Sequence, residues 1–209
     1  MQNSVVLFDF DGTIANTLES IIKIMNKLSD EFGFKKIHAN QVEFLRGKRP
    51  LDILRSLEIS LFKLPFVIRK ARKEINSHIA YLSPTVDLLP VLKYLKRNNF
   101  KIGIVTTNTE ENVRKFLHAN NLDFFDLFYT TKKIFGKDKA ISKIIKDMRL
   151  EKSRVFFIGD EIRDIEAGKK AGVKTIGVSW GYNTREALQK HKPDFLIDSP
   201  HELEKIFTF

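Results

Sequence analysis

The sequence contains no cysteine among its 209 residues, and this absence excludes several kinds of site. Disulfide bonds, thiolate nucleophiles and cysteine-ligated zinc or iron–sulfur centres all require a thiol. Long apolar runs are also missing, because none approaches the roughly 20 residues of a membrane-spanning helix. The first residues lead into a strand-like run without the pattern of a signal peptide. We therefore expect a cytoplasmic protein that has no membrane partner.

Acidic residues are comparatively few, since 26 aspartates and glutamates stand against 36 lysines and arginines and leave a formal net charge of +10. Much of the excess falls between residues 46 and 73, where nine side chains are basic and two are acidic. Such a segment is either a solvated helix surface or a surface that attracts an anionic substrate or a nucleic acid. Phe62 and Phe66 lie at helical spacing, so we predict that they are core residues and do not stack on bases. We therefore do not expect a nucleic acid as the main partner.

The remaining composition is that of a globular protein, with 43% hydrophobic and 30% charged residues. Short, apolar, β-rich runs alternate along the chain with segments whose apolar residues recur at helical spacing. This alternation predicts an α/β fold, a Rossmann-like parallel sheet with helices on both faces. Such a sheet has its functional site at the carboxyl ends of its strands. The strand-like runs are 4–8, 101–105, 126–129, 154–158, 174–178 and 194–197.

One long interval interrupts the alternation of strands and helices. From about residue 15 to residue 83, apolar residues recur only at helical spacing and no strand-like run occurs. We therefore predict a catalytic core formed by residues 1–14 and 84–209, and a small all-helical cap domain formed by residues 15–83. Turns around Asn16 and at residues 82–85 would connect the two parts.

Polar residues follow the predicted strands where a functional site is expected. Asp9 and Asp11 come directly after the first apolar run, and Gly12 and Thr13 come next. Each polar residue has an ordinary explanation by itself, since an aspartate after a strand commonly caps a helix. Unrelated caps, however, have no reason to bring several carboxylates, a lysine and hydroxyls to one sheet edge. The other members of the set are Thr106, Thr107, Asn108, Lys137, Asp160 and Asp164.

Phosphoryl transfer is the chemistry that needs such a set. Clustered carboxylates repel one another unless a cation lies among them, and an all-oxygen site without cysteine or histidine suits Mg²⁺. One carboxylate can act as the nucleophile and form an acyl phosphate, while a second exchanges protons with the leaving oxygen and with water. A lysine, a hydroxyl and backbone N–H groups at helix N-termini can hold the phosphoryl oxygens.

The stretch DFDGT at residues 9–13, Thr106 after an apolar strand, Lys137, and Gly159-Asp160 with Asp164 resemble the four motifs of the haloacid dehalogenase-like hydrolases. They occur in that family's order and at compatible spacing over essentially the whole chain. Within the family the chain is most similar to the phosphoglycolate phosphatase-like subgroup, which carries a helical cap after the first motif. The resemblance implies a phosphoric monoester hydrolase that uses Mg²⁺. Its substrate would be a small phosphorylated metabolite of the phosphoglycolate, sugar-phosphate or nucleotide type.

The resemblance also implies a role for each matched residue. Asp9 would be the nucleophile and a magnesium ligand, and Asp11 would be the general acid and base, with its backbone carbonyl also on the metal. Lys137 would pair with the phosphate and with Asp9. Asp160 would bind the metal, and Asp164 would support the metal or its waters. The phosphate-binding residues would be Gly12, Thr13, Thr106, Thr107 and Asn108.

The phosphate-site lysine has more than one candidate. Relatives often have Lys-Pro in this motif, and no Lys-Pro occurs near it here. Lys132, Lys133 and Lys139 compete with Lys137, which we prefer because Gly136 precedes it and a predicted helix follows.

Substrate preference is expected to lie in the cap, where residues 45–50 (LRGKRP) resemble a loop that faces the active site in relatives. We predict that Arg46 contacts the substrate. A β-phosphoglucomutase-like phosphomutase is an alternative, but Pro50 stands where those mutases have a basic residue. A polynucleotide-end phosphatase would use the basic cap segment, and a response-regulator receiver would lack the helical insertion. The expected oligomeric state is a monomer or a homodimer.

Overall fold

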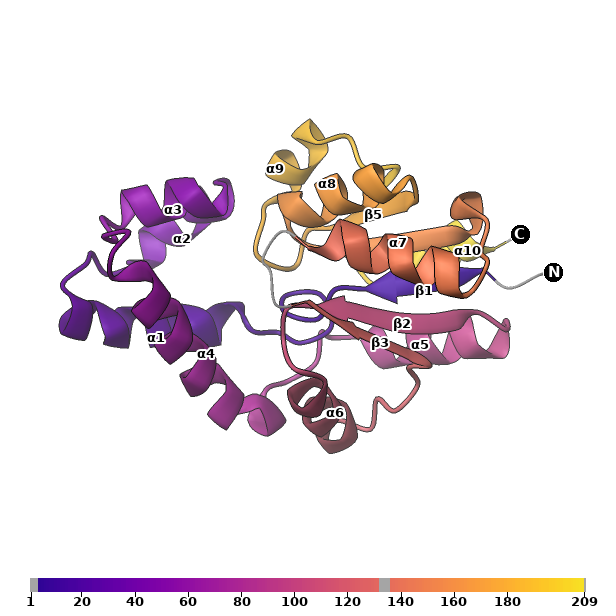
Figure 1. Ribbon diagram of the computed structural model, residues 1–209, viewed down its shortest axis with the longest axis horizontal. Coiled ribbons are helices and arrows are strands. Elements are labelled where there is room, and N and C mark those ends of the chain that lie inside the picture. The colour runs from indigo at the N-terminus through magenta and orange to yellow at the C-terminus, as the bar shows by residue number, and fades with distance from the viewer. Residues whose placement is uncertain (1–3, 132–135, 209) are drawn as a thin grey trace.

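The computed structural model describes residues 4–131 and 136–208 of the chain. Its centre is a parallel sheet of six strands in the order β3-β2-β1-β4-β5-β6 (Figure 1). The strands are β1 (Val5–Phe8), β2 (Lys101–Thr106), β3 (Leu127–Thr130), β4 (Val155–Gly159), β5 (Lys174–Val178) and β6 (Phe195–Ile197).

The first strand of the chain lies in the middle of the sheet. Val5 of β1 is in register with Lys101 of β2 on one side and with Val155 of β4 on the other. All four side chains of β1 are fully buried, because helices cover both faces of the sheet. This position explains why the run is continuously apolar instead of alternating with polar residues.

Alternate residues of β1 contribute to two different layers of the core. Val6 and Phe8 belong to the cluster that contains residues of α5, α6 and α10. Val5 and Leu7 pack with residues of α7 and α8 on the opposite face (Figure 1). The core helices are α5 (Leu88–Arg97), α6 (Glu110–Ala119), α7 (Lys137–Asp147), α8 (Ile162–Ala171), α9 (Arg185–Lys190) and α10 (Glu202–Phe207), with short 3₁₀ turns at η2 (Ile79–Tyr81) and η3 (Lys152–Arg154).

Four helices between β1 and α5 form the cap, which lies beyond the carboxyl ends of the strands (Figure 1). The longest, α1, ends at Gly33, whose φ of 69° is the left-handed conformation that glycine adopts without strain. Leu28 of α1 buries against Val67 and Ala71 of α4, so the cap has its own small apolar core. The elements are α1 (Leu18–Phe32), η1 (Ala39–Gln41), α2 (Val42–Arg46), α3 (Pro50–Ser56) and α4 (Leu64–Ser77).

The two segments that connect the cap to the sheet run side by side in opposite directions. The N–H of Asn16 donates to Ser83 O at 2.9 Å, and the N–H of Thr85 donates to Ile14 O at 2.8 Å. Ala15 and Pro84 form an antiparallel bridge between these bonds. The cap is therefore joined to the core through a short paired ribbon.

The predicted α/β fold with an inserted helical cap is confirmed, but two predictions about apolar side chains are wrong. Phe62 and Phe66, predicted to be core, are 91% and 53% exposed. Phe62 precedes α4, and Phe66 is adjacent to the buried Val67 on a helix that rotates by about 100° per residue. No helix in the described part of the chain is long and apolar enough to cross a membrane.

Candidate active site

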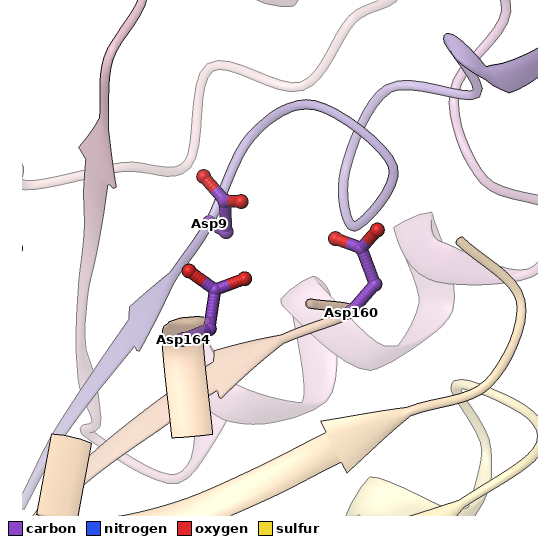
Figure 2. Close-up of side chains that lie close together, drawn as sticks. All are labelled: Asp9, Asp160 and Asp164. Carbon is purple, nitrogen blue, oxygen red and sulfur yellow. The ribbon is translucent and has the colours of Figure 1, made fainter. Parts of the chain in front are cut away.

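Three buried carboxylates meet at the carboxyl ends of the two central strands. Asp9 follows β1, Asp160 follows β4, and Asp164 lies in the first turn of α8 (Figure 2). Each offers one carboxylate oxygen, and these three oxygens lie within 4.8 Å of one another. The exposed fractions of the three residues are 2%, 0% and 1%, so the cluster is shielded from water.

The chemistry of this donor set fits a hard divalent cation. All three groups are carboxylates, and Mg²⁺ prefers oxygen ligands of this kind. Burial, together with the neighbouring charge of Asp9, raises the pKa of Asp160 well above its usual range. A cation among the three groups would remove that repulsion. Asp160 is already oriented, because Thr13 Oγ1 and the N–H of Tyr182 each donate to its carboxylate at 2.6 Å.

Lys137 is the cation that the structure places inside this cluster. As the first residue of α7, it lies with its Nζ 2.6 Å from Asp9 Oδ2 and 2.6 Å from Asp164 Oδ1. Burial disfavours its charge, yet Asp164 and Asp9 hold the pKa of Lys137 above its ordinary value. Lys139 is exposed. The other two candidates, Lys132 and Lys133, lie outside the described residues.

Asp9 and Asp11 differ because the chain turns sharply after β1. Gly12 has a φ of 82°, and a Cβ there would lie 2.2 Å from Asp160 Oδ2, so only glycine fits this turn. Burial raises the pKa of Asp9 to about 7, although Lys137 acts in the opposite direction. Burial likewise raises the pKa of Asp11 to about 6, against the opposing charge of Lys137. Asp11 is less buried than Asp9 and accepts a hydrogen bond from the side chain of Asn108.

The predicted phosphate-binding residues lie in the turns next to the carboxylates. Thr106, the last residue of β2, is 2% exposed, and its Oγ1 accepts from the N–H of Asn108 at 3.0 Å. Thr107 lies between them and is partly exposed. The Thr13 hydroxyl is committed to Asp160. Their contribution to phosphate binding stays a prediction.

Arg46 lies in the cap, apart from the carboxylate cluster. Its guanidinium donates to Ser179 O at 2.8 Å, to Gly181 O at 3.1 Å and to Glu43 Oε2 at 2.9 Å. The first two acceptors belong to the core loop after β5, so Arg46 fastens the cap to the core. Contact with a substrate, which the sequence suggested, stays a prediction.

Three residues near the site are not among the residues predicted to form it. Glu161 and Arg163 form a short ion pair beside Asp160, and Arg163 is close enough to oppose the rise in the pKa of Asp9. Tyr182 donates its N–H to Asp160, and its hydroxyl is 2.9 Å from Thr17 Oγ1. Glu161 and Arg163 lie within the GDEIRD stretch, so their position beside two site aspartates was a usable signal.

Comparison with known proteins gives one consistent result. A family model described as "Haloacid dehalogenase-like hydrolase" matches residues 6–178. Among curated proteins, the chain is 26% identical to "Phosphoglycolate phosphatase" of Synechococcus elongatus, covering 97% of this chain and 96% of that protein. It is 29% identical to "Pyrophosphatase PpaX" of Bacillus cereus, and the match covers 100% of this chain and 98% of that protein. A haloacid dehalogenase-like hydrolase from Streptococcus pneumoniae shares the fold at a TM-score of 0.84 and 18% identity, covering 99% of both chains.

Proposed function

The chain belongs to the haloacid dehalogenase-like hydrolase family, and we propose that it is a Mg²⁺-dependent phosphatase that cleaves phosphate monoesters through an aspartyl-phosphate intermediate. One observation carries this proposal. The buried carboxylate of Asp9 lies 2.6 Å from Lys137 Nζ, within a cluster completed by Asp160 and Asp164. The names of its relatives, "Phosphoglycolate phosphatase" and "Pyrophosphatase PpaX", support the transfer of a phosphoryl group to water.

Asp9, Asp160 and Asp164 would hold the Mg²⁺, and the backbone carbonyl of Asp11 would complete the protein ligands. When bound, the ion supplies positive charge that neutralises the carboxylates and the phosphoryl oxygens. The chain already supplies part of that charge through Lys137, which the ion would complement.

In the first step, a carboxylate oxygen of Asp9 attacks the phosphorus atom as the bond from phosphorus to the ester oxygen breaks. Asp11 donates a proton to the departing oxygen, which leaves as an alcohol. Its pKa of about 6 suits this role, because part of the population is protonated in slightly acidic to neutral solution. Lys137 and Thr106 would hold the phosphoryl oxygens, where negative charge is concentrated in the transition state.

In the second step, water attacks the phosphorus of the aspartyl phosphate. Asp11, now a carboxylate, takes a proton from that water as the bond between Asp9 and phosphorus breaks. Inorganic phosphate leaves, and Asp9 regains its carboxylate. Asp9 is paired with Lys137 whereas Asp11 accepts a hydrogen bond from Asn108, so one carboxyl can form the ester while the other exchanges protons.

We also propose that residues 1–14 and 84–209 form the catalytic domain and residues 15–83 the cap. The paired ribbon of residues 14–16 and 83–85 supports this division, because a hinge there would move the cap as one body. Phosphomutase activity is less well supported, since a second phosphate site is expected in the cap. Pro50, at the position that is basic in such mutases, lies against an apolar cavity.

The proposal is tested by measuring phosphate release from a panel of phosphorylated metabolites, with Mg²⁺ and with chelator. We expect Mg²⁺-dependent turnover that falls at least about a thousandfold in Asp9→Asn. Asp30→Asn, an exposed carboxylate paired with Lys36, is the matched control and should retain full activity. Substantial turnover by Asp9→Asn, with its circular dichroism spectrum unchanged, would refute the assignment of the nucleophile. Isomer formation without phosphate release would favour a mutase.

A further inference from the structure

A cavity of about 170 Å³ lies between the cap helices and the core, and the proposed phosphoryl chemistry does not use it. Its walls are mainly aliphatic side chains from three cap helices. They include Leu18, Ile21, Ile22 and Met25 of α1, Leu45 of α2 and Ile53 of α3.

The cavity begins beside the catalytic carboxylates, because two of its lining residues also flank them. Tyr182 donates its N–H to Asp160. Its ring packs closely against Gly12, since a Cβ built on Gly12 would lie only 2.5 Å from Tyr182 Cδ2. Glu161 directly follows Asp160 and is close enough to raise the pKa of Asp11. Asp9 and Asp11 do not line the cavity themselves, so it would receive only the part of a substrate that extends past Tyr182 and Glu161.

Most polar groups around this cavity are already committed to other partners, and Lys48, which also lines it, has its Nζ 4.5 Å from the centroid of the Phe44 ring. The Tyr182 hydroxyl pairs with Thr17, and Glu161 pairs with Arg163. The side-chain amide of Asn183 donates to Arg46 O at 2.6 Å and to Lys48 O at 3.2 Å. A sugar or glycolate group placed against the aliphatic walls, away from Lys48, would lose hydrogen bonds to water without replacing them, which is unfavourable. An apolar group would lose nothing and would gain from leaving water.

The volume also sets the size of the group. In another protein, an engineered apolar cavity of about 150 Å³ accommodates benzene. A cavity of about 170 Å³ thus admits one phenyl ring or a short alkyl chain.

We propose that this cavity binds the apolar part of the leaving group, so that preferred substrates are phosphate monoesters of alcohols carrying a short alkyl or aryl group. The inference rests on the proposed function and names the class of its leaving group. The bond-breaking steps at Asp9 and Asp11 are unchanged.

The test is a series of straight-chain alkyl phosphates from ethyl to octyl, compared with 2-phosphoglycolate and glycerol phosphate in the presence of Mg²⁺. Leaving-group basicity is nearly constant along the alkyl series, so chain length reports on binding. We expect kcat/KM to rise about fourfold for each buried methylene and then to level off once the cavity is filled. A rate that stays flat or falls with chain length, or a preference for the polar esters, would overturn the inference.

Two variants locate the effect in the cavity. Ile22 lines the cavity but belongs to neither of the buried clusters of the cap, so Ile22→Trp should fill the space without disrupting the fold. It should abolish the gain in kcat/KM between ethyl and hexyl phosphate. Lys23→Trp adds the same ring at the adjacent exposed position and should keep the gain. Equal chain-length profiles in both variants would contradict the inference.

The two proposals fail in different ways. If the wild-type protein hydrolyses none of the alkyl or polar esters, the proposed phosphatase function is wrong. If it hydrolyses them with no dependence on chain length, the phosphatase function stands and the apolar leaving-group site is wrong.

Discussion

Replacing Lys137 by methionine should destabilise the protein, because it leaves buried carboxylates without their cation. Lys137 is 3% exposed, and its Nζ lies 2.6 Å from both Asp9 Oδ2 and Asp164 Oδ1. Methionine keeps most of the aliphatic volume and removes the charge. Breaking one partner of a buried ion pair costs about 3–5 kcal/mol. For a chain of this size, each kcal/mol lowers Tm by roughly 2–4 °C, so we expect a decrease of about 6–20 °C in chelator.

The loss of stability should depend on pH in a defined direction. The pKa of Asp9 is already raised to about 7 by burial, and removing Lys137 takes away an effect that lowers it. A carboxyl whose pKa is higher in the folded state than in the unfolded state binds protons preferentially when folded. It therefore lowers stability as pH rises from the unfolded pKa of about 4 towards the folded value. Acidification from pH 7.5 to pH 5 should restore part of the stability lost in Lys137→Met.

The assay is urea unfolding followed by circular dichroism at pH 7.5 and pH 5, in chelator so that bound metal does not contribute. Lys139→Met is the matched control, because Lys139 lies on the same helix and is exposed. The reasoning is refuted if Lys137→Met and Lys139→Met have unfolding free energies within about 1 kcal/mol of each other at both pH values. A larger deficit of Lys137→Met at pH 5 than at pH 7.5 would also contradict it.

Two further predictions concern polar contacts away from the carboxylate cluster. Arg46→Ala should lower the unfolding free energy by about 2 kcal/mol, because the carbonyls of Ser179 and Gly181 lose a charged donor. The control is Arg49→Ala, which removes an exposed ion pair and should lower the unfolding free energy by less than about 1 kcal/mol. Unchanged stability of Arg46→Ala together with a raised KM would instead support substrate contact. Burial opposes the ionisation of Asp194, but hydrogen bonds from Thr175 leave its pKa below the usual value. The stabilising effect of its carboxylate should thus be present above about pH 4 and be lost in more acid solution. In urea unfolding, the unfolding free energies of the wild type and of Asp194→Asn should therefore converge as the pH falls. A difference between them that is constant from pH 7 to pH 3 would contradict this.

Strand positions could be predicted closely because buried parallel strands are short, apolar and continuous. The run predicted at 154–158 is β4 at Val155–Gly159, and that predicted at 174–178 is β5 at Lys174–Val178. The meeting of Asp9 and Asp160 also followed from the strands alone, since carboxyl ends of parallel strands share one sheet edge.

The cap was less predictable because exposure there depends on how short helices pack. Phe62 and Phe66 have helical spacing, yet α4 buries the stripe of Val67, Ala71 and Ile75. A sequence pattern gives the period of a helix, but a helix with apolar residues on several sides does not reveal which side is covered.

Contacts between distant segments were beyond sequence reasoning for a different reason. The bonds of Arg46 to the loop after β5 join residues more than 130 positions apart. No local rule relates such positions, because the pairing depends on how the cap sits over the sheet. The ion pair of Glu161 and Arg163 joins residues two positions apart, so it was easier to predict from the sequence. Its position beside the aspartates, however, could be derived only by knowing where α8 begins.

The central position of β1 has a consequence for how the protein is made. The ribosome releases Val5–Phe8 well before both neighbouring strands, which begin at Lys101 and Val155. The whole cap can emerge and form its local helices while this strand still has no sheet partner. The apolar strand β1 therefore remains without its sheet partners for longer than the other strands do. During that time it is the segment most exposed to misassociation. Asp9 acquires its surroundings only when the second half of the chain has been synthesised.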